Sequence, residues 1–253
     1  MDQWAHVNRF AKNHPLEKCI VAVVTMFLVL LWDKPIFHGI ILLGMGAATV
    51  IGAGIPFKIY LKYISIPFVF ILMTLLSIIL EIHSDNRGYI YAIEILHVFV
   101  GITHESIGVA VGLLFRSIAT LTCLYFLAMT TPMQDIIYLL EKIHCPSIFT
   151  ELMVLIYRFV FVFLNTARTI YYAQSTRLGY KGFYRSLKSL STLSSVLFIK
   201  AYLQAKALYQ ASLSRGYQGK FYGLVNNKLL NVNRLIGIII LEIGLLILGG
   251  LSP

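Results

Sequence analysis

Long apolar runs separated by short polar turns dominate the chain and predict a helical membrane protein. Crossing the hydrocarbon core as a helix takes about 20 residues. Asp33-Lys34-Pro35 is a tight polar turn between two such runs, and Pro56 begins the next connection. We therefore expect an all-α, polytopic fold with about five transmembrane helices. The expected spans are Glu17–Trp32, Ile36–Gly54, Tyr63–Leu80, Ser106–Met129 and Leu235–Leu251.

The connection between the third and fourth spans is long enough to hold structure of its own. It runs from Glu81 to Glu105 and contains the polar turn Asp85-Asn86-Arg87-Gly88. The stretch that follows, Tyr89–Val100, is weakly amphipathic, which is typical of segments at a membrane interface. Whether it spans the membrane or lies in the interface stays open at this stage.

Residues 131–234 show a different pattern, with apolar positions spaced for helices but more polar residues between them. Thr131-Pro132 is typical of a helix start, and that helix is expected to end near His144. Two further helices are expected at about 147–174 and 186–213. We expect all three to be too polar to span and to lie at the inner-leaflet boundary. The predicted division is 1–130, four spans; 131–234, a helical platform on the cytosolic side; and 235–253, the last span.

Charge supports this division and predicts an orientation. The chain is 58% hydrophobic and only 13% charged, with a net charge of +10. Residues 131–234 contain thirteen Lys and Arg against three acids, Asp135, Glu141 and Glu151. Basic residues beside spans favour the cytoplasmic side, so we expect a cytoplasmic N-terminus and a C-terminus outside, in a bacterial or archaeal cytoplasmic membrane. The apolar content of the basic block argues against nucleic acid as a partner.

One phrase occurs twice, each time after a predicted helix. Arg177-Leu178-Gly179-Tyr180-Lys181-Gly182-Phe183-Tyr184 returns, slightly re-spaced, as Arg215-Gly216-Tyr217-Gln218-Gly219-Lys220-Phe221-Tyr222. A glycine just past a helix end commonly takes the left-handed conformation, and a cation in the last turn suits the helix dipole. We expect Gly179 and Gly216 to set the geometry of two similar helix ends that each present an arginine.

The motifs together resemble those of a known family. Four segments are similar to sequences of the transmembrane (T) subunit of energy-coupling factor (ECF) transporters. They are Thr130-Thr131-Pro132, Tyr157-Arg158, Ala173–Tyr180 and Leu213–Tyr217. Within that family the chain most resembles the CbiQ branch of cobalt importers. The opening Met1–Ala5 is similar to that branch too, and the likeness covers nearly the whole chain.

This resemblance implies a coupling role without catalysis on this chain. T subunits link two ABC ATPases, which bind ATP, to a substrate-binding membrane subunit. In a cobalt importer that subunit is CbiM-like, in some cases with a CbiN-like small subunit. The family's coupling helices each end in an Ala-Arg-Gly-like motif that docks on one ATPase; the matching triplets here are Thr176-Arg177-Leu178 and Ser214-Arg215-Gly216. The implied docking residues are Ser175, Thr176, Arg177, Leu178, Gly179, Ser214, Arg215 and Gly216, supported by Tyr180 and Tyr217.

No other motif provides chemistry of its own. The chain has no P-loop, and residues 152–234 contain no Asp or Glu to hold a catalytic metal ion. The seven histidines form no i,i+4 pair with one another or with a cysteine, so we expect no metal site and no cofactor on the chain. Arg116, inside the fourth span, is expected to pair within the bundle, with Glu81, Glu94 or Glu242 as the conceivable partner.

We also expect membrane lipid to surround the chain. Two alternatives to a cobalt importer stay open. One is a T subunit for nickel or a vitamin, which differs only in its partner. The other is a stand-alone carrier or channel, which should show polar residues near the membrane midplane. The spans offer few such residues beyond Arg116 and Glu242.

Overall fold

The computed structural model describes residues 2–83, 89–95, 98–217 and 230–251. The chain forms two compact units, residues 1–135 together with 227–253, and residues 136–226. In the first unit the elements are α1 (Asp2–Val7), η1 (Arg9–Lys12), α2 (Pro15–Leu31), α3 (Pro35–Ala47), the π-helical turn η2 (Ala48–Gly52), α4 (Phe57–Ile79), β1 (Glu81–His83), β2 (Tyr89–Ile95), β3 (Val98–Thr103), α5 (His104–Thr130) and α9 (Val232–Leu251). Helix α6 (Met133–Lys142) leads from the first unit into the second, which contains α7 (Ser147–Thr176) and α8 (Phe183–Ser214).

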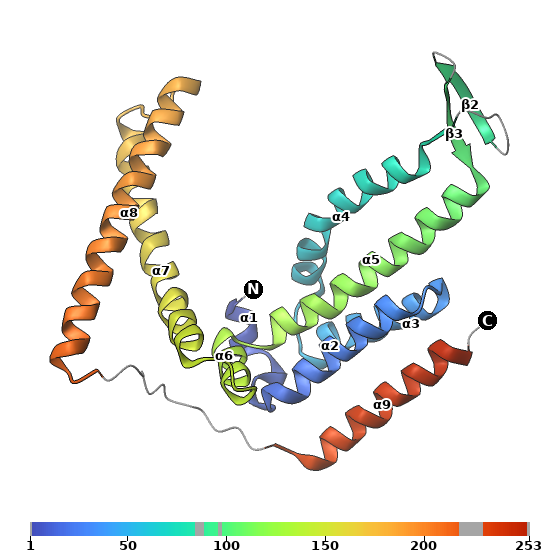
Figure 1. Cartoon of the computed structure of the whole chain (residues 1–253), viewed down its shortest axis with the longest axis horizontal. Helices are drawn as coiled ribbons and strands as arrows, with labels where there is room; N and C mark the ends of the chain where they lie inside the picture. The colour runs from blue at the N-terminus through green and yellow to red at the C-terminus, as the bar shows by residue number, and fades with distance from the viewer. Residues whose placement is uncertain (1, 84–88, 96–97, 218–229, 252–253) are drawn as a thin grey trace. The chain divides into compact units, whose positions relative to one another are not determined.

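The long helices of the first unit pack around α5, which contacts α2, α3 and α4, while α9 packs on α2 (Figure 1). Val29 of α2, Phe37 of α3, and Ala119 and Cys123 of α5 are almost completely buried in one cluster. Ala119 and Cys123 are four residues apart and therefore share one face of α5. Small side chains on that face let neighbouring helices approach closely, as is common between membrane helices.

Local sequence signals explain where these helices begin. Pro15 and Pro35 occupy the first helical positions of α2 and α3, where a missing N–H costs nothing. The side chain of His14 accepts a hydrogen bond from the Leu16 amide at the start of α2. Thr103 and Ser106 form a reciprocal capping box at the start of α5. The spans are therefore bounded by residues that satisfy the free ends of the backbone.

The connection between α4 and α5 folds as a small antiparallel sheet with the strand order β1-β3-β2. Strands β2 and β3 form a hairpin that extends from the α4 and α5 ends (Figure 1). The stretch Tyr89–Val100 was expected to span the membrane or lie in its interface; its described backbone is strand, while residues 96–97 lie outside the described part. The expected all-α membrane class is confirmed, with this sheet as a local departure.

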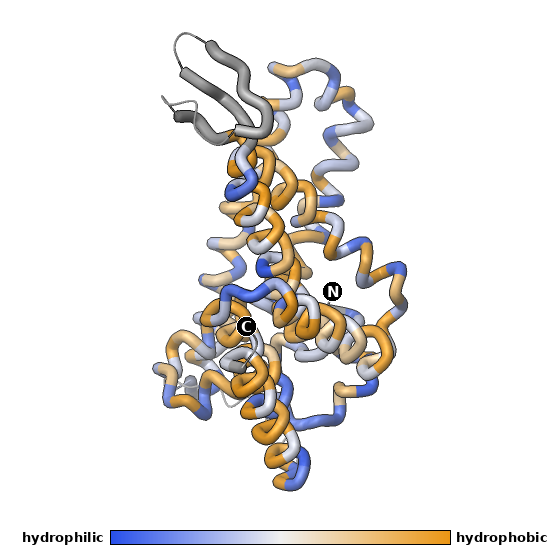
Figure 2. The backbone as a smooth tube through the Cα atoms, turned by 90° about the vertical axis from the view of Figure 1, so that its right-hand side faces the viewer, coloured by the Kyte–Doolittle hydropathy of each residue, from blue (hydrophilic) through white to orange (hydrophobic). Residues whose placement is uncertain are grey.

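The second unit is a hairpin of two long antiparallel helices, α7 with 30 residues and α8 with 32. The C-terminal end of α7 lies beside the start of α8, and the two helices separate toward the other end (Figure 1). Gly182, with φ of 90°, occupies the N-cap position of α8 and allows the chain to reverse. Hydrophobic residues dominate the long helical runs of the chain, with hydrophilic residues concentrated at turns and helix ends (Figure 2).

Five helices of the described chain are long and apolar enough to cross a membrane, which confirms a multi-pass membrane protein. They are Pro35–Gly52, Phe57–Ile79, His104–Thr130, Ser147–Thr176 and Val232–Gly250. Helix α7 is among them because its apolar residues form a long run with few charges, although the helices of residues 131–234 were expected to be too polar to span. Helix α2, the first expected span, has 17 residues. At about 1.5 Å per residue it is slightly shorter than the hydrocarbon core.

Candidate functional site

The end of α7 forms a cap in which two backbone hydrogen bonds close the last turn. Arg177 is the C-cap residue with φ −92° and ψ 16°. The Gly179 amide donates to the Gln174 carbonyl at 2.9 Å, and the Leu178 amide donates to the Ser175 carbonyl at 3.0 Å. This is the pairing of a Schellman motif, which satisfies carbonyls that a helix end would otherwise leave free.

The end of α8 repeats the same cap. Arg215 is its C-cap residue with φ −96° and ψ 10°. The Tyr217 amide donates to the Ser212 carbonyl at 3.0 Å, and the Gly216 amide donates to the Leu213 carbonyl at 3.0 Å. The two copies of the phrase therefore place their arginines at the same position of the same backbone motif.

The left-handed residue differs between the two caps. Gly216 has φ of 76°, as expected for a glycine at this position, but in the first cap the left-handed residue is Leu178, with φ of 58°. The expectation that Gly179 sets the first cap by its backbone conformation is therefore wrong. A Cβ on Gly179 would lie 2.8 Å from both the Gln174 carbonyl oxygen and the Ser189 Oγ. Glycine is required there because α8 packs closely against the end of α7.

The first end is braced by polar contacts with the start of α8. Ser189 Oγ donates to the Gly179 carbonyl at 2.8 Å, and Gln174 Nε2 donates to the Ser189 carbonyl at 3.1 Å. The Tyr180 hydroxyl donates to Gln174 Oε1 at 2.8 Å, and its ring lies 4.7 Å from that of Tyr171. The predicted supporting residue Tyr180 thus holds the helix end from inside the hairpin.

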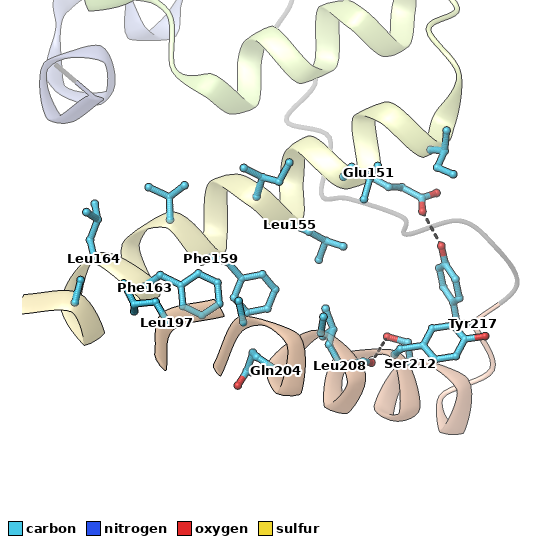
Figure 3. Close-up of a pocket in the computed structure, with 18 residues that line it drawn as sticks. Glu151, Leu155, Phe159, Phe163, Leu164, Leu197, Gln204, Leu208, Ser212 and Tyr217 are labelled. Carbon is cyan, nitrogen blue, oxygen red and sulfur yellow. Dashed lines mark hydrogen bonds between the residues drawn. The ribbon is translucent and has the colours of Figure 1, made fainter. Parts of the chain in front are cut away.

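The second end is braced by one long-range hydrogen bond. The Tyr217 hydroxyl donates to Glu151 Oε2 at 2.7 Å, which connects the end of α8 to the first turns of α7 (Figure 3). Donation to this carboxylate raises the pKa of the Tyr217 phenol. Tyr217 therefore helps to set the distance between the two helices at the end where they separate.

The hydroxyl side chains just before the two arginines hydrogen-bond to their own helices. Ser175, Thr176 and Ser214 donate to backbone carbonyls three or four residues earlier, at 2.7, 3.0 and 3.0 Å. Thr176 and Ser214 are exposed, and Ser175 is half-buried.

Both arginines are exposed, and within the described residues neither side chain makes an ion pair or a hydrogen bond. Because α7 and α8 are antiparallel, Arg177 and Arg215 lie at opposite ends of the hairpin. A helix of 30 residues is about 45 Å long, which indicates the scale of their separation. The structure therefore brings each predicted triplet together at its own helix end and does not bring the two triplets to one site. It presents two separate guanidinium groups, each able to bind a carboxylate through two parallel hydrogen bonds.

Sequence reasoning did not single out Gln174, Ser189 or Glu151 as parts of these ends. Gln174 lies inside the family motif Ala173–Tyr180, but nothing in the sequence indicates a partner fifteen residues later. Glu151 lies 66 residues from Tyr217 in the chain. Its only sequence signal is that it is the last acid before the acid-free stretch 152–234.

An apolar groove of about 780 Å³ lies between α7 and α8. Leu155, Phe159 and Phe163 of α7 and Leu197 and Leu208 of α8 line it (Figure 3). The Glu151–Tyr217 hydrogen bond lies at one end, and the other lining side chains are nearly all apolar. An exposed apolar groove is typical of a site where lipid or another helix is bound.

Polar groups in the first unit have structural partners. Arg116 Nη2 donates to the Leu30 carbonyl at 2.5 Å, and Arg116 Nη1 lies 3.7 Å from Asp33 Oδ1. The expected pairing with Glu242 is wrong, because Glu242 accepts a hydrogen bond from Thr25 at 2.9 Å. The side chains of the other expected partners, Glu81 and Glu94, lie outside the described part.

The search for a metal site concerns the described residues alone. No group of three or more His, Cys, Asp or Glu among them could hold a metal ion. His38 is completely buried and its Nε2 lies 2.8 Å from the Trp32 carbonyl, so it holds the turn between α2 and α3. His97 lies outside the described residues.

The helices and the two arginine-bearing ends define a multi-pass helical membrane protein with a helical hairpin that has two outward-facing cationic tips. Comparison with known proteins identifies the family. A profile of the CbiQ family, described as cobalt transport protein, matches residues 7–223, and the chain belongs to this family.

Individual relatives agree with this assignment. The chain is similar to the cobalt transport protein CbiQ of Salmonella typhimurium, with 27% identity over 88% of this chain and 98% of the relative. It is similar to CbiQ of Rhodobacter capsulatus, with 28% identity over 83% of this chain and 81% of the relative. A fused cobalt transport protein CbiMQ of Methanocorpusculum labreanum is 35% identical over 68% of this chain and 28% of the relative.

Proposed function

We propose that this chain is the coupling subunit of an ECF-type cobalt importer. In this function it transmits movements of two ABC ATPases to a substrate-binding membrane subunit. The family assignment makes it a membrane component of cobalt transport. The observation that supports the coupling role best is the pair of matching helix caps, each with an exposed C-cap arginine whose side chain has no ion-pair partner in the part of the chain that the structure describes.

Each arginine is suited to dock on a separate ATPase. A guanidinium that meets a carboxylate in a groove fixes orientation as well as contributing binding free energy. The Schellman caps fix the backbone of both arginines at the tips of long helices, so little backbone conformational freedom is lost on binding. Two equivalent tips at opposite ends of one hairpin suit two copies of an ATPase.

The sequence around the two arginines is free of acids. Residues 152–234 contain no acid, and Glu151, the nearest acid before them, accepts the Tyr217 hydroxyl. In this proposal the carboxylates that pair with Arg177 and Arg215 belong to the ATPases. ATP and its hydrolysis belong to the ATPases in this proposal, and the present chain is non-catalytic.

A membrane partner needs an apolar surface, and the hairpin has one. The groove between α7 and α8 offers an apolar lining to a neighbouring helix. The fused relative carries both names, CbiM and CbiQ, in one chain, which supports a CbiM-like protein as the partner here. We propose a cytoplasmic N-terminus, a C-terminus outside and a hairpin accessible from the cytosol, because the positive charge is concentrated there.

Affinity purification of the tagged chain from its native membrane tests this function. Partners are identified by mass spectrometry beside an Arg177→Glu/Arg215→Glu variant. We expect ABC ATPases and a membrane protein to co-purify with the wild type and the ATPases to be lost from the variant. The matched control is Arg185→Glu/Lys200→Glu, which reverses two exposed cations of α8 that are not C-cap residues. Purification without ATPases, or ATPase binding that ignores Arg177 and Arg215, contradicts the proposal.

A further inference from the structure

The end of α5 is held by polar side chains from the N-terminal region. The Asn8 Nδ2 donates to the Met129 carbonyl at 3.2 Å and the Thr130 carbonyl at 3.4 Å. Lys18 Nζ donates to the Thr130 carbonyl at 2.8 Å. The last carbonyls of a helix lack intrahelical partners and carry partial negative charge, so a cation and an amide donor stabilise them.

Lys18 also reaches the next helix. Its Nζ lies 3.6 Å from Oδ2 of Asp135, which belongs to the first turn of α6. Both side chains are largely buried, with 4% and 13% of their surfaces exposed. One lysine therefore contacts both sides of the break between α5 and α6, where Thr131-Pro132 interrupts the helix.

Stability alone does not explain a buried ion pair at this position. Replacing such a pair by apolar residues is often neutral or stabilising, because removing two charges from water is costly. A pair of this kind does fix the direction in which two elements meet. Asp135 is the last residue of the first unit before the chain enters the second, and α6 continues from it into that unit.

We propose that Lys18 and Asp135 are positioning residues for transport, forming the joint through which movement of α6 acts on α5 and α2. This inference rests on the proposed coupling function. A displacement of α6 reaches Asp135 directly, and Lys18 passes it to the Thr130 carbonyl and to the start of α2. The ion pair then transmits ATPase movement as a rigid-body shift of membrane helices.

The test uses the complete complex, with its ATPases and membrane partner, reconstituted in proteoliposomes. The Lys18→Met/Asp135→Asn variant removes both charges of the pair at similar side-chain volume. We expect it to assemble with its ATPases and hydrolyse ATP, while cobalt uptake per ATP falls by about fivefold or more. Lys18→Arg keeps the cation and should stay near wild type.

Asp33→Asn is the matched control, since it removes an ion-paired aspartate of the first unit, on Arg116, far along the chain from α6. If the double variant takes up as much cobalt per ATP as the wild type, the proposed role of the pair is wrong. Failure of the double variant to assemble, while Lys18→Arg assembles, also overturns it, because the pair is then required for folding. A wild-type chain that binds no ATPase contradicts the proposed function instead, so the two failures are distinguishable.

Discussion

The ends of α7 and α8 share one backbone motif but are built from different residues. Both are Schellman caps with an arginine at the C-cap, and the arginine dihedral angles agree within a few degrees. The left-handed position holds Leu178 in one and Gly216 in the other. The shared feature is therefore the placement of the arginine, which indicates that the position of the guanidinium is what both ends have to provide.

The support of the two ends also differs. The first is packed against the start of α8 through Gln174, Tyr180 and Ser189. The second depends on the Tyr217–Glu151 hydrogen bond across the open side of the hairpin. We therefore expect the first end to be sensitive to side-chain volume and the second to the loss of a single polar contact.

The largest effect is expected when both arginines are reversed. Arg177→Glu/Arg215→Glu should reduce ATP-driven cobalt uptake by the reconstituted complex at least about a hundredfold, because losing one partner of a buried charged pair costs roughly 2–5 kcal/mol. Uptake of radioactive cobalt into proteoliposomes measures it. If the Arg185→Glu/Lys200→Glu control loses as much, total charge and not the caps explains the result.

Substituting each glycine by alanine should affect the stability of the two caps to different extents. Gly179→Ala places a Cβ against a backbone carbonyl and Ser189, and should destabilise the first end by about 2 kcal/mol. Gly216→Ala meets no atom within 4 Å and should cost about 1 kcal/mol, from its left-handed backbone alone. Hydrogen exchange of the Gly179 and Tyr217 amides reports each cap. If the Gly179 and Tyr217 amides lose equal protection from exchange in their respective variants, the proposed difference in packing between the caps is wrong.

Tyr217→Phe should loosen the second end alone. Loss of one hydrogen bond is expected to weaken ATPase binding about twofold to fivefold, and Tyr180→Phe is the matched change at the first end. The pKa of the Tyr217 phenol is raised, so the hydrogen bond is intact below about pH 10 and is lost as pH rises through the raised value. The protection of amides at the second end, measured relative to the intrinsic base-catalysed exchange rate at each pH, should therefore fall at alkaline pH in the wild type. The phenylalanine variant should show no such fall in protection, and an equal fall would contradict a role for this phenol.

The smallest effect is expected at the left-handed leucine. Leu178→Gly removes the steric cost of a left-handed side chain and should stabilise the first cap by about 1 kcal/mol. Leu178 is exposed, so little buried surface is lost. Slower exchange of the Gly179 amide would confirm this. Faster exchange would show that the leucine side chain stabilises the cap by packing.

Sequence patterns predicted the elements whose signals are local. The apolar runs and the proline and threonine helix starts placed most helices within a few residues of their observed bounds. The strands β2 and β3 were missed, although Tyr89–Ile95 is rich in aromatic and β-branched residues that favour strands. At α7 the polar ends obscured an apolar middle that is long enough to cross a membrane.

Contacts between distant residues could not be predicted in the same way. Nothing near Leu178 indicates a left-handed backbone, although a Cβ on the next residue, Gly179, would lie 2.8 Å from Ser189 Oγ of α8. Lys18 and Asp135, like Glu151 and Tyr217, meet only after the helices have packed. Arg177 and Arg215 were singled out from sequence because a repeat is visible without a fold. Their separation at opposite ends of a hairpin was not predicted.

The mass of the intact detergent-solubilised complex tests the central claim most directly. If each cap docks one ATPase, native mass spectrometry should show two ATPase subunits with the wild type. It should show at most one when either Arg177→Glu or Arg215→Glu is introduced, and none in the double variant. Two ATPases retained by the double variant, with the Arg185→Glu/Lys200→Glu control unchanged, would contradict docking through the two arginines.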